Sequence, residues 1–154
     1  MRLDAVLSTL KLDMLEDSLA LTIWLKPGEE VMINGARVEN LQPHKIRLQF
    51  NNTVRMLRSR DRLEVVGQPS FAEAIYTQAM YLSGGEDVGN AATLKAAICQ
   101  LQVAPEREEI YGSGVDAVLD RVSAHAEAGQ YYEAMVAARD LIAAEQPNHP
   151  LLPR

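Results

Sequence analysis

The chain has 154 residues, of which 47% are hydrophobic, and it carries a formal net charge of −6. This length suits one compact domain or two small units that share a core, and the ordinary apolar content excludes a disordered chain. The single cysteine excludes an internal disulfide, and no apolar run reaches the roughly eighteen residues that cross a membrane. These features favour a globular protein of the reducing cytoplasm.

The first twenty residues have the pattern of an amphipathic helix. Their apolar side chains recur at helical spacing and would share one face, namely Leu3, Val6, Leu7, Leu10 and Met14. Asp4 and Lys11 interrupt these residues, so the segment is not expected to be an export signal. We interpret residues 1–20 as an extension whose helix packs on the body of the protein or on a second subunit. The alternative is that translation starts at Met14 and that residues 1–13 are not native.

Residues 21–66 are predicted to form a β-rich unit. Five short β-prone runs occupy residues 21–25, 30–33, 36–41, 45–50 and 53–57. Lys26-Pro27-Gly28 can turn the chain after the first run, and Asn34-Gly35 is the strongest two-residue hairpin signal. Strands this closely spaced favour a small antiparallel sheet or half-open barrel.

The fourth run alternates between apolar and charged residues. Ile46, Leu48 and Phe50 are predicted to face the core, whereas Lys45 and Arg47 would face solvent. Strict alternation therefore places cations on one exposed face of the sheet.

The fifth run and the residues after it are rich in arginine. Val54 and Met56 are predicted to point inward and Arg55 outward. If the RSRDR segment at 58–62 is extended, its three arginines lie on one side, and Asp61 is placed to tether one of them.

Charge is unevenly distributed along the chain. Residues 21–66 carry eight basic and five acidic side chains, whereas residues 67–154 carry five basic and twelve acidic ones. Most of the eight cations are arginines, whose planar fork suits phosphates and guanine edges. We interpret them as candidate RNA-binding residues: Lys26, Arg37, Lys45, Arg47, Arg55, Arg58, Arg60 and Arg62. The alternative is that a basic stretch simply neutralises the acidic half of the chain.

Residues 67–154 change to the hydrophobic period of helices. Pro69 is expected in the first turn of a helix that ends at Gly84-Gly85, and a second helix is predicted over about residues 88–103. Pro105 and the YGSG stretch at 111–114 indicate a loop.

A helical hairpin is predicted to end the chain. One helix begins near Val115, Gly129 is expected to cap its C-terminal end, and a second helix runs from Tyr131 to about Ile142. The sequence thus predicts an α+β fold: a small N-terminal antiparallel β-sheet or half-barrel, followed by a helical bundle or hairpin.

No pattern typical of a catalytic or metal site is present. Cys99 lies within a predicted helix without a nearby histidine, and we interpret it as buried packing. His44, His125 and His149 lack the spacing of metal ligands. Walker loops, dinucleotide-binding fingerprints and nucleophile elbows are absent. The sequence indicates a protein that is not an enzyme and that needs no cofactor or metal.

Four segments resemble the flagellar-biosynthesis repressor family FlbT of alphaproteobacteria. They are LKPGEEVMINGARVEN at 25–40, RSRD at 58–61, IYTQAMYL at 75–82 and EAGQYYEAMVAARDLI at 127–142. The resemblance runs from about residue 21 to 145, and GGEDVGNAA and YGSG depart from the family's pattern. It implies a cytoplasmic regulator of flagellum biogenesis and motility. Such a protein associates with the 5′ untranslated leader of flagellin mRNA and limits its translation or lifetime, alongside a small companion regulator called FlaF. In some relatives the regulation has the opposite sign.

The 23–60 stretch is also similar to the carbon storage regulator family of RNA-binding proteins. The similarity comprises an opening strand, Gly28-Glu29, MI at 32–33, IR at 46–47, and Val54 followed by Arg58. In that family the first strand and the arginine after the last strand meet RNA. The similarity therefore implies RNA contacts for Ile23 with its neighbours and for Arg58.

Two hypotheses of different classes follow. In the first, the β-unit binds flagellin mRNA and represses its translation. In the second, the helices form an adaptor for FlaF, flagellin or an export component, and the contact surface comprises Ile75, Tyr76, Ala79, Tyr131 and Tyr132. Core packing is the alternative explanation for the apolar stripe in either case. A homo-oligomer is compatible with both.

Overall fold

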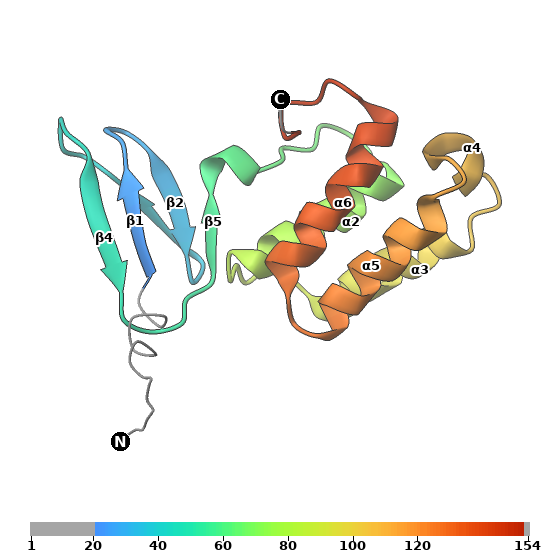
Figure 1. Ribbon diagram of the computed structural model, residues 1–154, viewed down its shortest axis with the longest axis horizontal. Helices are drawn as coiled ribbons and strands as arrows, with labels where there is room; N and C mark the ends of the chain where they lie inside the picture. The colour runs from blue at the N-terminus through green and yellow to red at the C-terminus, as the bar shows by residue number, and fades with distance from the viewer. Residues whose placement is uncertain (1–20, 153–154) are drawn as a thin grey trace, which may run out of the picture. The chain divides into compact units, whose positions relative to one another are not determined.

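We describe residues 21–152 of a computed structural model, shown in Figure 1. The helix expected within residues 1–20 lies outside these residues. The strands are β1 (Leu21–Leu25), β2 (Glu30–Ile33), β3 (Ala36–Glu39), β4 (Ile46–Phe50) and β5 (Met56–Arg58). A 3-10 turn, η1 (Ser59–Asp61), follows, and the helices are α2 (Phe71–Ser83), α3 (Ala91–Gln102), α4 (Arg107–Tyr111), α5 (Val115–Glu127) and α6 (Tyr131–Glu145). Strands followed by helices confirm the predicted α+β class.

The described chain divides into two compact units. The strand unit comprises residues 21–31 and 37–54, and the helical unit comprises residues 32–36 and 55–152. The sequence predicts a boundary near residue 66, but the structure assigns residues 55–66 to the helical unit. The reason is that Leu57 and Leu63 belong to the buried core that the helices form.

The strand unit is organised by the antiparallel pairing of β1 with β4. Ile23 lies opposite Leu48, and Leu25 lies opposite Ile46. Ile23 and Leu25 are buried, and Leu48 and Ile46 are half-buried, so the apolar side of both strands forms the small core of this unit. The alternation predicted for residues 45–50 is thereby confirmed.

A buried asparagine closes the strand unit. The Asn40 side-chain amide donates to the carbonyl oxygens of Leu25 at 3.0 Å and His44 at 2.9 Å. Its Oδ1 accepts the Gln42 N–H at 2.8 Å. Because a buried polar group costs free energy unless it is hydrogen-bonded, these three bonds fix the turn that leads into β4.

The second sheet has the strand order β3-β2-β5. The turn between β2 and β3 has Asn34 at φ 50° and Gly35 at φ 83°, as the Asn-Gly hairpin signal predicts. This hairpin tip belongs to the helical unit, where the Gly35 N–H donates to the Gly84 carbonyl at 2.7 Å. A Cβ on Gly35 would lie 2.6 Å from the Gly85 carbonyl oxygen. The Gly84-Gly85 pair therefore both ends α2 and admits the hairpin backbone at close range.

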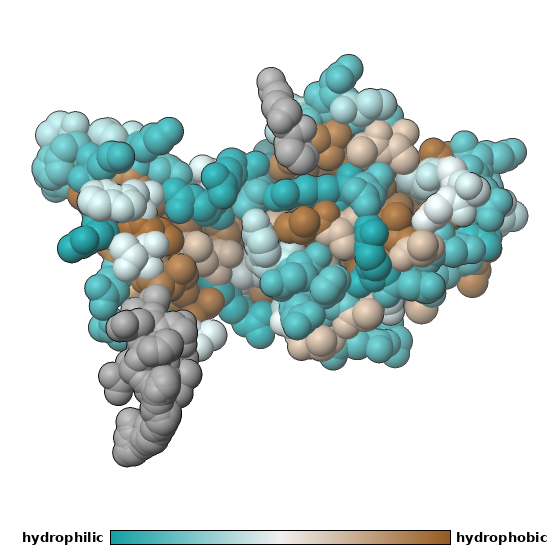
Figure 2. All heavy atoms as spheres, viewed as in Figure 1, coloured by the Kyte–Doolittle hydropathy of each residue, from teal (hydrophilic) through white to brown (hydrophobic). Residues whose placement is uncertain are grey.

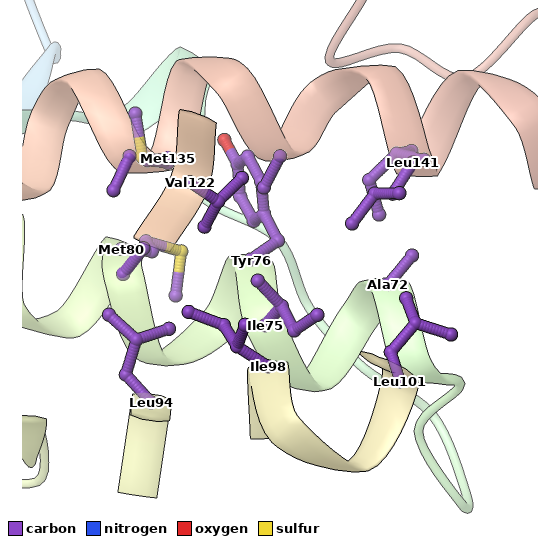
Figure 3. Packing of buried hydrophobic residues seen from close by; sticks show 14 of the residues in the cluster. Ala72, Ile75, Tyr76, Met80, Leu94, Ile98, Leu101, Val122, Met135 and Leu141 are labelled. Carbon is purple, nitrogen blue, oxygen red and sulfur yellow. The ribbon is translucent and has the colours of Figure 1, made fainter. Parts of the chain in front are cut away.

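The helical unit is built around α2, which packs against α6 and α3, while α5 packs against α6 and α3. Figure 3 shows α2 side chains Ile75, Tyr76 and Met80 directed into the space shared with Met135 and Leu94 of neighbouring helices. All five are almost completely buried. The period of 3.6 residues in the sequence thus marks the inward faces of the helices.

The helix ends follow local capping chemistry. Ser70 is the N-cap of α2: its hydroxyl accepts the Glu73 N–H at 3.1 Å, and Glu73 accepts the Ser70 N–H at 2.9 Å. This capping box places Pro69 before the helix, so the prediction that Pro69 lies in the first turn is wrong. At the end of α5, Gly129 has φ 74°, which agrees with the predicted cap.

The stretch predicted as a loop after Pro105 contains a short helix, α4. Tyr111 at its end donates a hydrogen bond to Glu145 of α6, and Glu145 also accepts from the Ser70 hydroxyl at 2.8 Å. Burial raises the pKa of the Tyr111 hydroxyl, and the hydrogen bond to Glu145 raises it further, to a smaller extent. These tertiary bonds stabilise a segment whose sequence indicates a loop. Between residues 21 and 152 no helix is both long enough and apolar enough to span a membrane.

Candidate nucleic-acid interface

The side of β1 and β4 that faces solvent carries the first group of candidate residues. Trp24 lies opposite Arg47 in the antiparallel register, and Thr22 lies opposite Gln49. Lys45 directly precedes β4. All five side chains are exposed. The strand pairing therefore brings Lys45 and Arg47 together on one surface, as the alternation predicts.

This surface, which we call the β1–β4 face, contains cations and uncharged polar groups but no carboxylate. Its members are Thr22, Trp24, Lys26, Lys45, Arg47 and Gln49. The neighbouring turn does contain a carboxylate, Glu29, whose Oε1 accepts the Lys26 backbone N–H at 2.9 Å. Since none of the six side chains is acidic, the face has a locally positive character in a chain of net charge −6.

Trp24 is the centre of the β1–β4 face. The Lys45 Nζ lies 5.6 Å from the centroid of its ring, and the Arg47 guanidinium carbon lies 5.8 Å from it. Both distances are within the range of cation–π attraction. The ring thereby holds two flexible cations close together on one strand pair.

Arg37 lies on the β2–β3 hairpin and not on the β1–β4 face. Its Nε is 3.5 Å from Oε1 of Glu30, and both side chains are well exposed. An exposed ion pair of this kind contributes about 0–1 kcal/mol, so the guanidinium can exchange partners at little cost.

The second group of arginines does not form the predicted extended run. Residues 59–61 form the turn η1, so alternation does not place the three side chains of 58–62 on one side. Arg60 is exposed, Arg58 is half-buried, and Arg62 forms an ion pair with Glu86. Of these three arginines, Arg60 is the one most open to a polyanion.

Arg55 is exposed but has several partners within the helical unit. Its guanidinium donates to the Leu82 carbonyl at 3.2 Å and lies 5.2 Å from the centroid of the Tyr131 ring. Its backbone N–H donates to the Asn34 side chain at 2.8 Å. These contacts assign Arg55 a packing role between the hairpin tip, α2 and α6. Leu57 is buried and Met56 is only half-buried, so the prediction that Met56 is the inward residue here is wrong, whereas Arg55 is exposed as predicted.

Asp61 anchors the η1 turn to the helices. Its carboxylate accepts a hydrogen bond of 2.5 Å from Arg139 of α6, and its backbone carbonyl accepts one of 2.6 Å from the Tyr76 hydroxyl. The sequence predicts that Asp61 tethers a neighbouring arginine, but its partner is Arg139, which is 78 residues away. Nothing in the local sequence indicates this pairing, because it depends on how α6 packs.

The residues predicted for partner binding are mostly core. Ile75, Tyr76 and Ala79 are fully buried, so the prediction that they form a contact surface is wrong, and the alternative of core packing holds for them. Tyr131 is half-buried beneath Arg55, and Tyr132 is exposed. Figure 2 shows mainly hydrophilic residues on one face of the molecule, with hydrophobic residues between them.

The remaining chemically reactive residues are dispersed. Cys99 is exposed, so its expected role in buried packing is wrong. The ring of His125 lies 2.8 Å from Gln130 Oε1, and His44 is exposed near the turn before β4. Among the described residues, no three potential metal ligands gather in one place.

Comparisons with known proteins agree with the resemblance in the sequence. The family model "Flagellar protein FlbT" matches residues 21–148, which is most of the chain. No curated protein and no solved structure matches. The matched region covers every described strand and helix. This chain therefore belongs to the FlbT family of flagellar proteins.

Proposed function

We propose that this chain regulates flagellin synthesis after transcription by binding the 5′ untranslated leader of flagellin mRNA. Binding would limit the translation or stability of the message, so the chain would act as a repressor in the cytoplasm. The β1–β4 face is the observation that carries the proposal, because it groups three cations and no carboxylate. Membership of a flagellar family supports the connection with flagellin.

The face supplies the two kinds of contact that RNA binding needs. Lys26, Lys45 and Arg47 can neutralise phosphates, which gives affinity that falls with salt because counterions are released. Thr22 and Gln49 can exchange hydrogen bonds with base edges or 2′-hydroxyl groups. Regulation of this kind needs no catalytic group: a protein bound over a ribosome-binding site excludes the ribosome by occupancy.

The candidate arginines contribute unequally in this proposal. Arg60 contacts phosphate from the η1 turn, and the exposed Arg37 can leave Glu30 for a phosphate. Arg55 and Arg62 act mainly by holding the turn and strand in place, because their guanidinium groups already have protein partners. The half-buried Arg58 joins them in this structural group.

The acidic helical unit favours this choice of surface. Residues 55–154 carry nine basic and fourteen acidic side chains, a net charge of −5. Residues 21–54 carry four basic and three acidic ones. The negative charge of residues 55–154 repels a polyanion, whereas the slightly positive charge of residues 21–54 does not. Electrostatics therefore directs RNA to the strand residues.

The test is a salt series of leader-RNA binding. The double variant Lys45→Ala/Arg47→Ala should weaken binding and reduce the slope of log affinity against log salt by about 1.5, from two lost phosphate contacts. The matched control is Lys95→Ala, which removes an exposed cation from α3 and should leave the slope unchanged. An unchanged slope in the double variant would contradict the assignment of RNA to this face.

A protein adaptor is the second candidate function, and one observation favours it. A groove of about 400 Å³ lies between α5 and α6, and it is lined by His125, Tyr132 and Val136 among others. Tyr132 and Val136 are large apolar side chains left exposed at the surface. FlaF, flagellin or an export component would be the partner in this reading.

Purified components separate the two functions. The adaptor hypothesis predicts that FlaF or flagellin binds the chain with an affinity that Tyr132→Ala lowers and Lys45→Ala/Arg47→Ala leaves unchanged. The RNA hypothesis predicts the reverse pattern with leader RNA.

A further inference from the structure

Trp24 has an unusual position for the only tryptophan of the chain. It lies on the solvent side of β1 and is 51% exposed, although two cations contact its ring. Tryptophan carries a large apolar surface that is usually buried to a greater extent. The strand pairing does not explain its exposure, since the apolar residues of β1 face the other way.

We propose that Trp24 is a stacking platform for an unpaired nucleobase of single-stranded RNA. This inference rests on the proposed function and deepens it, because it names the form of RNA that the β1–β4 face recognises. Base–aromatic stacking is the common means by which proteins bind single strands.

The geometry around the ring fits a nucleotide. Arg47 lies directly across the strand pair from Trp24, and Lys45 approaches the same ring from the start of β4. A base that stacks on the indole has a phosphate on each side along its backbone. Two cations within 6 Å of the ring centroid are suitably placed for those phosphates.

The charge of the face selects RNA over an apolar protein partner. A hydrophobic protein surface that covers Trp24 would also remove Lys26, Lys45 and Arg47 from water, and a buried charge without a partner is costly. Phosphates supply the missing negative charge, because no carboxylate belongs to the face.

The exposed ring also selects single strands over duplexes. In a duplex the faces of the bases are stacked on one another, so they are closed to a protein side chain. A duplex can still contact the cations, but it offers the indole no base face.

The fluorescence of Trp24 reports this contact directly, because no other tryptophan contributes to the signal. The full chain is titrated with three probes: flagellin leader RNA, the same RNA annealed to its complement, and heparin as a polyanion without bases. Excitation near the red edge of the tryptophan band and a free tryptophan standard correct for absorption by RNA. The leader should quench the fluorescence to saturation, whereas duplex and heparin should leave it nearly unchanged.

Variants separate stacking from charge. Trp24→Ala should weaken binding of labelled leader RNA about tenfold in anisotropy, as expected from the loss of one stacked base. Trp24→Phe should lose much less, because it keeps an aromatic face. Leu41→Ala is the matched control, since it removes an exposed apolar side chain of the strand unit that lies outside the face, and it should bind normally. Thermal unfolding of each variant verifies that it is folded.

Each outcome decides the inference. Quenching by the leader alone, with the Ala variant weak and the Phe variant near normal, supports the stacking platform. Two results overturn the inference but leave the proposed function standing. In the first, leader RNA binds in anisotropy without quenching the fluorescence of Trp24; in the second, it binds Trp24→Ala as tightly as the unchanged chain. A folded chain that binds no leader RNA in either assay overturns both.

Discussion

The strand unit and the helical unit differ in how much apolar surface they bury. Among the described residues, the strand unit buries three apolar side chains, those of Ile23, Leu25 and Val31. The core of the helical unit contains twenty buried apolar residues. The helices thus supply most of the hydrophobic stabilisation. The strand unit exposes the β1–β4 face, whose side chains are polar, aromatic or positively charged.

The largest expected effect comes from removing core volume in each unit. Leu119→Ala in α5, where the side chain is fully buried, should lower the free energy of unfolding by about 3–4 kcal/mol. Leu48→Ala in β4, where the side chain is half-buried, should cost about 1–2 kcal/mol because less surface and volume are lost. Chemical denaturation measures both. Equal losses in the free energy of unfolding would contradict the claim that the helical unit has the larger stabilising core.

The next effect tests how the η1 turn is attached to the scaffold. Asp61→Ala leaves Arg139 without its carboxylate, and the loss of one partner of a largely buried pair should cost about 3 kcal/mol. The matched control is Asp140→Ala, which breaks an exposed pair with Arg121 and should cost under about 1 kcal/mol. If thermal denaturation gives similar values for the two variants, the turn is not anchored through Asp61.

The pH dependence of stability gives a second test of how the η1 turn is attached, because the Tyr76 hydroxyl donates to the Asp61 carbonyl. Burial, opposed in part by Arg139, raises the pKa of Tyr76 to about 12. The folded state therefore holds the proton more tightly than the unfolded state, whose tyrosine pKa is about 10. This stabilisation is complete below pH 10 and is lost as pH rises from about 10 to 12, by about 2–3 kcal/mol in all.

Tyr76→Phe isolates that contribution. The variant should lose about 1 kcal/mol at neutral pH with the hydrogen bond to the Asp61 carbonyl, and its stability should fall less steeply above pH 10. Tyr132→Phe, at an exposed position, is the comparison variant and should lose less stability at neutral pH than Tyr76→Phe. Urea unfolding at a series of pH values gives both curves, and parallel curves for all three proteins would refute the role of Tyr76.

The smallest expected difference is between two glycines that lie on either side of β2, Gly28 and Gly35. Gly35→Ala should cost about 2 kcal/mol, because φ is positive and the new Cβ meets the Gly85 carbonyl. Gly28→Ala should cost about 1 kcal/mol, because φ is also positive but nothing lies within 4 Å. Melting temperatures rank the two variants. The reverse order would show that the hairpin tip does not pack on the Gly84-Gly85 pair.

The parts of the molecule that follow from local rules could be predicted from the sequence. The alternation of Lys45 to Phe50 predicts which face of β4 is exposed, and Asn34-Gly35 predicts a hairpin, because both depend on backbone geometry within a few residues. The apolar period of α2 predicts a buried stripe. The apolar period does not predict whether the protein's own core or a partner covers that stripe, and in the structure the core covers Ile75, Tyr76 and Ala79.

The ion pairs that the arginines form with distant acidic side chains could not be predicted from the sequence. Arg62 pairs with Glu86, 24 residues away, and Asp61 pairs with Arg139, 78 residues away. Such pairs form only after the helices have packed, so a local charge count cannot identify them. The same holds for α4, whose Tyr111 bonds to Glu145 at the far end of the helical hairpin.

Ultraviolet cross-linking of the intact chain to flagellin leader RNA, read by mass spectrometry of the joined peptides, tests the central claim most directly. The account predicts cross-links in residues 22–26 and 45–49, where the β1–β4 face lies. Cross-links confined to residues 115–145 would contradict it, because they would place the RNA on α5 and α6.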